Sequence, residues 1–201
     1  MVFEVVGLSL LIGKLRGGSI RNLEKLNVKG WYFFIIAFIM EFISILAVGS
    51  IQGSLSRFII NNVFIIHTTI YILVILGFLS NIKEKWLRVS LVGTILNFIP
   101  IFANGGKMPV SINGLSSKYS YNQIELLKSN KILTHKIITE NTKFYYLSDL
   151  IPIPRPYLFP KIISIGDIII SIGIFFLIQS YMKYSLSKVN MINFSGYHKY
   201  N

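Results

Sequence analysis

Long apolar segments separated by short polar ones run through this chain of 201 residues. Four of them approach the roughly 20 apolar residues that cross a hydrocarbon layer about 30 Å thick, and a shorter apolar run precedes them. Because lipid cannot hydrogen-bond open backbone groups, such segments fold as helices. The pattern therefore predicts an all-α integral membrane bundle, a single membrane domain over residues 1–201, with helices at about 2–13, 31–48, 62–79, 87–103 and 162–181.

The first apolar run, residues 2–13, is short for a span, and runs of about 10–14 residues also lie along membrane interfaces. A cleaved signal peptide carries positive charge before its apolar part and a small-residue cleavage site after it. Here Glu4 comes early and Lys14, Arg16 and Arg21 follow. We interpret the run as a retained first helix, and the sequence leaves open whether it spans.

Composition supports the same class. Hydrophobic residues make up 53% of the chain and the mean hydropathy is +0.61, which is more apolar surface than a soluble domain of this length buries. Lipid must cover the excess. The chain has no cysteine, so disulfides, thiolate metal sites and cysteine nucleophiles are excluded.

The formal net charge of +12 is spread over loops, with no basic helix or aromatic-interleaved groove, so no nucleic-acid partner is expected. Residues 14–30 carry five Lys or Arg, residues 81–88 carry three and the tail after Tyr181 carries three, while a loop expected at 51–61 carries only Arg57. By the positive-inside rule, this distribution predicts a cell-membrane protein with an outer N-terminus, five spans and a cytoplasmic C-terminus. The outer segment, residues 104–160, carries seven basic residues, but long loops are translocated with little regard to charge.

This outer segment is expected to lie over the helix ends and to be partly helical. Ser120-Tyr-Asn-Gln123 matches a capping box, which predicts a surface helix to about Ser129, and residues 132–138 are a candidate for a second short amphipathic element. The prolines between 152 and 156 predict a stiff, extended descent toward the last span.

A glycine-containing motif, Asn104-Gly105-Gly106-Lys107-Met108-Pro109-Val110, stands where the fourth span ends. The two glycines permit positive φ and close backbone approach, and Pro109 holds Met108 extended. Exposed N–H groups together with Lys107 could cradle an anion such as a lipid phosphate. The alternative is a tight turn that leaves the bilayer, and spacing alone favours the turn.

Polar side chains follow one face of three spans, and on the second span Glu41 and Ser44 lie one turn apart. Asp167 lies about one turn into the last span and shares a face with Ser164 and Ser171. A similar stripe on the fourth span contains Ser90, Thr94, Asn97 and Asn104. These stripes indicate either a polar site inside the bundle or hydrogen bonding between helices.

Glu41 lies in the middle of the second span, where a carboxylate must be protonated, paired or hydrated. His67 on the third span is a candidate partner. An intramembrane Glu and His can relay protons, although a lone buried His is more often a satisfied polar group.

In the outer segment, His135, Glu140 and Asp149 could form a general acid–base set or a weak metal site, but no motif typical of hydrolases or metal enzymes supports either. Solvated loop residues are the simpler interpretation. We therefore assign no catalytic residue, metal ion or cofactor.

The order of these motifs resembles an uncharacterised family of small bacterial multi-pass membrane proteins known only as a domain of unknown function. The resemblance rests on NGGxMPV, then a His, then Thr142, Leu147 and Asp149, then prolines, then Ser164-x-Gly-Asp167, and on Leu15-Arg-Gly-Gly18 with Leu23 and Leu26 downstream. It implies five helices and no particular reaction. It also implies that the signature residues gather at the outer face: Asn104, Gly105, Gly106, Met108, Pro109, His135, Asp149, Gly166 and Asp167.

Three functions compete. The leading hypothesis is a membrane-embedded binding or accessory protein whose outer face recognises a membrane lipid, a small solute or a protein partner, with homo-oligomerisation left open; it leans away from an enzyme. The second is a small proton or solute transporter that uses Glu41, His67 and Asp167, with Asn97 as a further intramembrane polar candidate. The third is an outer-leaflet enzyme on a lipid-linked substrate, with His135 or Asp149 as general base and Asp167 near the reacting group.

Overall fold

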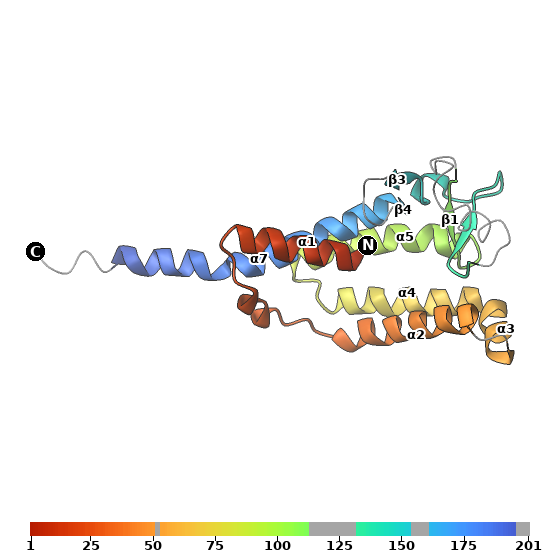
Figure 1. Ribbon diagram of the computed structural model, residues 1–201, viewed down its shortest axis with the longest axis horizontal. Helices are drawn as coiled ribbons and strands as arrows, with labels where there is room; N and C mark the ends of the chain where they lie inside the picture. The colour runs from red at the N-terminus through yellow and green to blue at the C-terminus, as the bar shows by residue number, and fades with distance from the viewer. Residues whose placement is uncertain (51–52, 113–131, 154–160, 196–201) are drawn as a thin grey trace, which may run out of the picture.

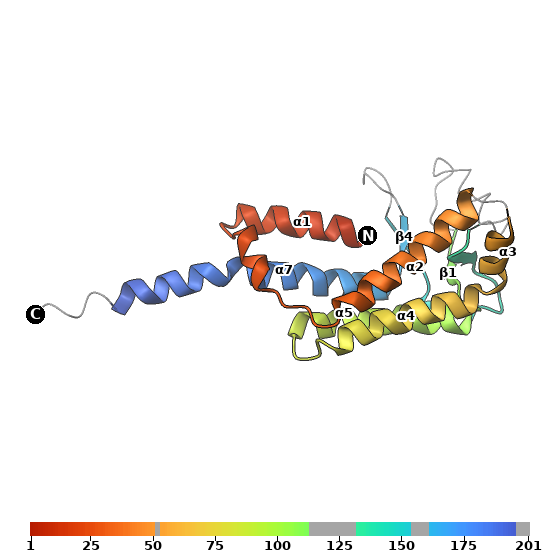
Figure 2. The same cartoon turned by 90° about the horizontal axis from the view of Figure 1, so that it is seen from below.

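The helices of the computed structural model form an open row, in which each helix packs on the next (Figures 1 and 2). The structure describes residues 1–50, 53–112, 132–153 and 161–195. The order in the row is α2 (Trp31–Ser50), α4 (Val63–Leu79), α5 (Lys85–Ala103), α7 (Ile165–Ser195) and α1 (Val2–Leu15). A short 3-10 helix, η1 (Ile20–Lys25), follows α1 and packs against α7.

Three helices are long and apolar enough to cross a membrane, over Trp31–Gly49, Lys85–Ala103 and Ile165–Lys183. The helix α4 has 17 residues and meets the same criterion only together with α3 (Ser54–Asn61), from which it bends by 71°. The helix α1 has 14 residues, about 21 Å at 1.5 Å per residue, which is shorter than the hydrocarbon layer. The described residues therefore contain three candidate spans, or four if the bent pair is one span, and helix length does not establish five.

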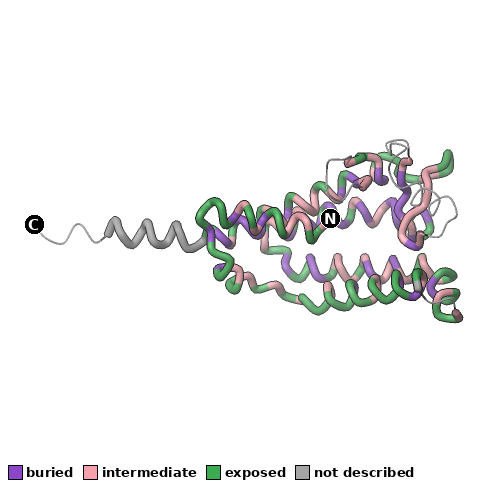
Figure 3. The backbone as a smooth tube through the Cα atoms, viewed as in Figure 1, coloured by how far each residue is buried: buried purple, intermediate pink, exposed green. Residues whose placement is uncertain are grey.

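The outward surface of α2 is apolar and exposed along its length (Figure 3). Phe38, Phe42 and Ile43 are examples, each about half exposed. In water such a continuous surface would be unfavourable, so this face of α2 is compatible with contact to lipid.

The prediction of a loop over residues 51–61 is wrong for Ser54–Asn61, which form the helix α3. This helix buries Ile59 against Ala47 and Leu133, and it exposes Leu55 and Phe58. Its length is only eight residues, and at that length packing rather than intrinsic propensity determines whether a helix forms.

Short strands lie at one end of the helix axes, where α5 ends and α7 begins. We call this end of the molecule the loop end. The strand β1 (Met108–Val110) pairs in parallel with β2 (His135–Ile137), and β3 (Ile151–Ile153) pairs antiparallel with β4 (Lys161–Ile163). A 3-10 turn, η2 (Tyr145–Leu147), lies between them in sequence.

In its described part, the outer segment consists of short strands joined by turns and the 3-10 turn η2, and residues 132–138 contain the strand β2. Pro152 lies extended in β3, opposite Ile162. The helix expected from Ser120 to Ser129 and the prolines at 154 and 156 lie outside the described residues.

Glycines allow α5 and α7 to approach closely. A Cβ at Gly166 would lie 2.6 Å from the carbonyl oxygen of Gly93 and would collide with the side chain of Asn97. A Cβ at Gly173 would lie 2.7 Å from the carbonyl oxygen of Trp86. Small residues at a helix contact serve this purpose in membranes, and here they bring the polar stripes of the two helices together.

Candidate functional site

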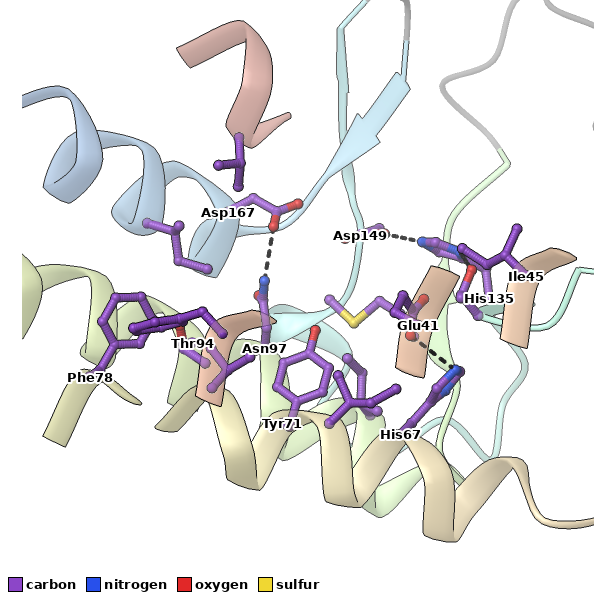
Figure 4. Close-up of a pocket in the computed structure, with 18 of the residues that line it drawn as sticks. Glu41, Ile45, His67, Tyr71, Phe78, Thr94, Asn97, His135, Asp149 and Asp167 are labelled. Carbon is purple, nitrogen blue, oxygen red and sulfur yellow. Dashed lines mark hydrogen bonds and ion pairs between the residues drawn. The ribbon is translucent and has the colours of Figure 1, made fainter. Parts of the chain in front are cut away.

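A cavity of about 590 Å³ lies among α2, α4, α5 and α7 at the loop end (Figure 4). Its polar lining comes from distant parts of the sequence and consists of Glu41, His67, Tyr71, Thr94, Asn97, Thr134, His135, Asp149 and Asp167. Three of the eight acidic residues of the chain line this cavity, and no Lys or Arg of the described residues does.

The motif that follows α5 forms a tight turn. Gly105 and Gly106 have φ of 76° and 83°, values that glycine adopts without strain. The side chain of Asn104 donates to the carbonyl oxygens of Pro100 at 2.7 Å and Lys143 at 2.8 Å, which ties the turn to the outer segment.

Two of the donors expected for an anion cradle at this motif are engaged within the chain. The N–H of Gly106 donates to the carbonyl oxygen of Ile101 at 2.8 Å, and the ammonium of Lys107 donates to that of Ile132 at 3.3 Å. Both donors therefore serve the fold.

The same motif also brings His135 and Asp149 together. Met108 in β1 pairs with His135 in β2 on one side. On the other side, the N–H of Asp149 donates to the carbonyl oxygen of Pro109 and the N–H of Ser111 donates to that of Asp149, both at 2.9 Å. As a result, His135 Nε2 lies 3.3 Å from Asp149 Oδ2. A pairing that sequence spacing could not indicate arises because both residues flank one strand.

Asp149 is only 4% exposed. Burial raises the pKa of its carboxyl, because a low-dielectric surrounding disfavours the charged form, and the hydrogen bond and charge of His135 lower this pKa in part. The imidazole also contacts Thr134, with His135 Nδ1 at 2.7 Å from Thr134 Oγ1. His135 is thus oriented from both of its ring nitrogens.

His67 faces Glu41 across the cavity, with His67 Nε2 3.8 Å from Glu41 Oε2. The other ring nitrogen, Nδ1, hydrogen-bonds the carbonyl oxygen of Gly106. A carbonyl oxygen only accepts, so Nδ1 carries the hydrogen and Nε2 is a bare acceptor in the neutral ring. This buried Nε2 has no hydrogen-bond partner in the described part of the chain.

Asp167 lies in the first turn of α7, where it caps the helix, and it also lines the cavity. Its N–H donates to Ser164 Oγ at 3.0 Å, and the N–H of Ser164 donates back to the Asp167 carboxylate at 3.4 Å, which is a capping box. Asn97 Nδ2 donates to the other carboxylate oxygen at 2.9 Å, and Ser164 Oγ donates to Asn97 Oδ1 at 2.6 Å. The stripes on α5 and α7 therefore do hydrogen-bond between helices at this level.

The residues singled out in the sequence divide into two groups. One group lines the cavity: Glu41, His67, Asn97, Met108, His135, Asp149 and Asp167. The other shapes the backbone around it: Asn104, Gly105, Gly106, Pro109 and Gly166. Glu140 belongs to neither group and is exposed in its loop.

Tyr71 and Thr134 also line the cavity and were not identified from the sequence. A signal for Tyr71 existed, since it follows His67 by one helical turn and so shares its face of α4. Tyr71 stacks on Phe98 with ring centroids 5.7 Å apart. Among the described residues, no group of three or more His, Asp or Glu is placed to hold a metal ion.

Comparison with known proteins identifies relatives over most of the chain. Residues 25–179 match the model of a family of unknown function, DUF5317, and this range contains every polar residue that lines the cavity. The chain is also 30% identical over 175 residues to an uncharacterised protein of Thermotoga maritima, across 87% of this chain and 88% of that protein. No solved structure matches the chain. The protein therefore belongs to the DUF5317 family of unknown function.

Proposed function

We propose that this protein is a membrane-embedded binding protein that holds an amphipathic molecule, a lipid or lipid-like solute, in the cavity at its loop end. One observation carries the proposal: the cavity is polar at one end and apolar at the other. His67, His135 and Asp149 lie toward the loop end, and Phe78 lies at the far end (Figure 4). A head group and an apolar chain match these two parts.

The apolar part of the cavity follows the helices away from the loop end. It is lined by Phe34, Ile70, Val74, Phe78, Ile170 and Ile174. Thr94 lies beside Phe78, and its hydroxyl donates to the carbonyl oxygen of Ser90 at 2.9 Å (Figure 4). Phe78 also belongs to a buried cluster with Leu87, Leu91 and Leu177. That cluster favours binding over a continuous proton or solute pathway, because a pathway needs polar or hydrated groups beyond this point.

In the membrane, α1, α2, α4, α5 and α7 are the five embedded helices of the proposal, with the loop end outside and the C-terminus cytoplasmic. The two basic segments at 14–30 and 81–88 support this orientation, because both lie at the end of the helix axes opposite the loop end (Figure 1). The ligand enters from the side between α2 and α7, which face one cavity while packing on α4 and α5 respectively.

Native mass spectrometry of the protein released from its membranes tests this function. The test compares Val74→Trp, which fills the apolar part of the cavity, with Ile72→Trp, which adds the same group to an exposed position of the same helix. Wild type and Ile72→Trp should retain a bound lipid-like molecule, and Val74→Trp should lose it. Equal retention in both variants, or none in wild type, would contradict the proposal.

A second function, chemistry on the head group, is favoured by the geometry of His135 and Asp149. A base must lie within hydrogen-bond reach of its proton and be oriented by a third group, and Asp149 orients His135 at 3.3 Å. If His135 acts as a base, His135→Gln should still hold a molecule in the cavity. The mass of that molecule should be that of the substrate, whereas wild type should hold the product. An unchanged mass spectrum would leave binding as the only function.

A further inference from the structure

We propose that the head group bound in this cavity carries a primary ammonium, or a closely related cationic donor, seated between Glu41 and His67. The inference rests on the proposed function, because it names the ligand class of the same cavity. Two independent observations carry it, one of charge and one of hydrogen bonding.

The charge of the cavity is opposite to that of the chain. The chain carries a formal net charge of +12, yet the described residues that line the cavity include Glu41, Asp149 and Asp167 and no Lys or Arg. In the described lining, His67 and His135 are the side chains that can carry positive charge. A concave site with an excess of one sign of charge and low-dielectric walls concentrates ligands of the other sign. A phosphate or carboxylate head group would instead face three acidic side chains.

The hydrogen-bonding groups of the cavity are unequally satisfied. The carboxylate of Asp149 is paired with His135, and that of Asp167 accepts from Asn97 and Ser164. Within the described part of the chain, Glu41 has only the contact with His67 Nε2 at 3.8 Å, a separation too long for a hydrogen bond. The missing donor is therefore between these two side chains.

His67 supplies the second observation. Its side chain is 5% exposed and lines the cavity, and its Nε2 has no partner in the described part of the chain. Gly106 holds the hydrogen on Nδ1, so in the neutral ring Nε2 presents a lone pair. A buried acceptor without a donor is unfavourable, so a ligand that supplies the donor gains affinity.

A primary ammonium fits both acceptors at once. Two atoms that are 3.8 Å apart can each lie about 2.9 Å from a common nitrogen, and an ammonium has three hydrogens to direct at them. A hydroxyl or a water molecule can bridge the same atoms but does not neutralise Glu41. Charge is therefore the property that separates an ammonium ligand from a neutral one.

The experiment uses the full-length protein in nanodiscs of zwitterionic lipid and four water-soluble six-carbon probes: hexylammonium, hexyltrimethylammonium, hexanol and hexanoate. Affinities come from calorimetry, with empty nanodiscs titrated in parallel to remove partitioning into lipid. We expect hexylammonium to bind at least about tenfold more tightly than hexanol or hexanoate, as a charged hydrogen bond of about 1.5–3 kcal/mol implies. Hexyltrimethylammonium should bind more weakly than hexylammonium, because it has no hydrogen to donate to Nε2.

Variants identify the partners of the ammonium. Glu41→Gln should weaken hexylammonium binding about ten- to hundredfold and leave hexanol binding within about threefold. The matched control Glu140→Gln makes the same chemical change at an exposed position outside the cavity and should alter neither affinity.

The outcomes separate this inference from the function on which it rests. Equal binding of all four probes would overturn the ammonium site while supporting an apolar binding cavity. The same holds if Glu41→Gln leaves hexylammonium affinity unchanged. Binding of none of the probes to wild type would overturn both proposals.

Discussion

Asp149 links the site to solution pH. Burial raises the pKa of its carboxyl above the ordinary value of 3.8, so between 3.8 and the raised value the folded protein holds a proton that the unfolded chain has lost. Stability therefore falls as pH rises through this window and carries no slope from Asp149 on either side of it. We expect Asp149→Asn to remove this slope. The melting temperature of Asp149→Asn minus that of wild type should therefore increase as pH rises through the window.

Thermal unfolding in nanodiscs over a pH series from about 3 upward checks this prediction. His135 and Asp167 are the charged neighbours that act on the Asp149 carboxyl. In His135→Gln, the decline in stability with rising pH should extend to higher pH, because the hydrogen bond that lowers the pKa of Asp149 is gone. A constant difference between wild type and Asp149→Asn across the series would show that this carboxyl does not titrate as argued.

The two glycines of the turn after α5 form a matched pair for a second prediction. Both have positive φ, so alanine at either position carries a strain of about 1–2 kcal/mol. Only at Gly106 would the added Cβ also meet backbone, 2.6 Å from the Cα of Phe64, while Gly105 has open space. We expect Gly106→Ala to lower the melting temperature clearly more than Gly105→Ala; equal losses would mean that α4 does not press on this turn.

Among the elements, the contact between α5 and α7 should be the most sensitive to added volume. Gly166→Ala inserts a methyl group against Asn97 and the carbonyl oxygen of Gly93, and this overpacking is expected to cost about 1–3 kcal/mol. Gly7→Ala is the control in α1, where nothing lies within 4 Å of the added atom. At that position alanine should be neutral or stabilising by about 0.5–1 kcal/mol, because glycine is a poor helix former.

Chemical unfolding of both variants in one detergent measures these differences. Loss of stability in Gly166→Ala alone would establish close packing of the two helices. Equal stability of the two variants would mean that α5 and α7 can separate without cost, and then the Asn97–Asp167 hydrogen bond could not hold the cavity wall in place.

For the whole molecule, orientation in the membrane is directly testable because the chain contains no cysteine. Single cysteines at Glu140 and at Lys83 replace exposed residues, the first at the loop end and the second in the loop before α5. A membrane-impermeant maleimide applied to intact cells should label Glu140→Cys and leave Lys83→Cys unlabelled until the cells are opened. The reverse pattern would invert the topology and turn the cavity toward the cytoplasm.

The mainly helical character of the protein and the approximate position of its apolar helices follow from the sequence. Hydropathy is a local property, and a run of apolar residues has few alternatives once water and lipid are the available surroundings. Local rules also identified polar residues that needed an explanation, such as Glu41 in the middle of an apolar segment, and suggested His67 as its neighbour. They did not reveal the helix α3, because it is short and depends on contacts with Ala47 and Leu133.

The cavity itself is a property of the tertiary structure. His135 and Asp149 meet because both flank β1. Their separation in the sequence does not indicate that they lie beside the same strand. Asn97 and Asp167 meet because glycines let two helices approach, which depends on how each helix is rotated about its axis. Local sequence decides which residues must find partners, and packing between distant segments decides which partners they find and what space remains between them.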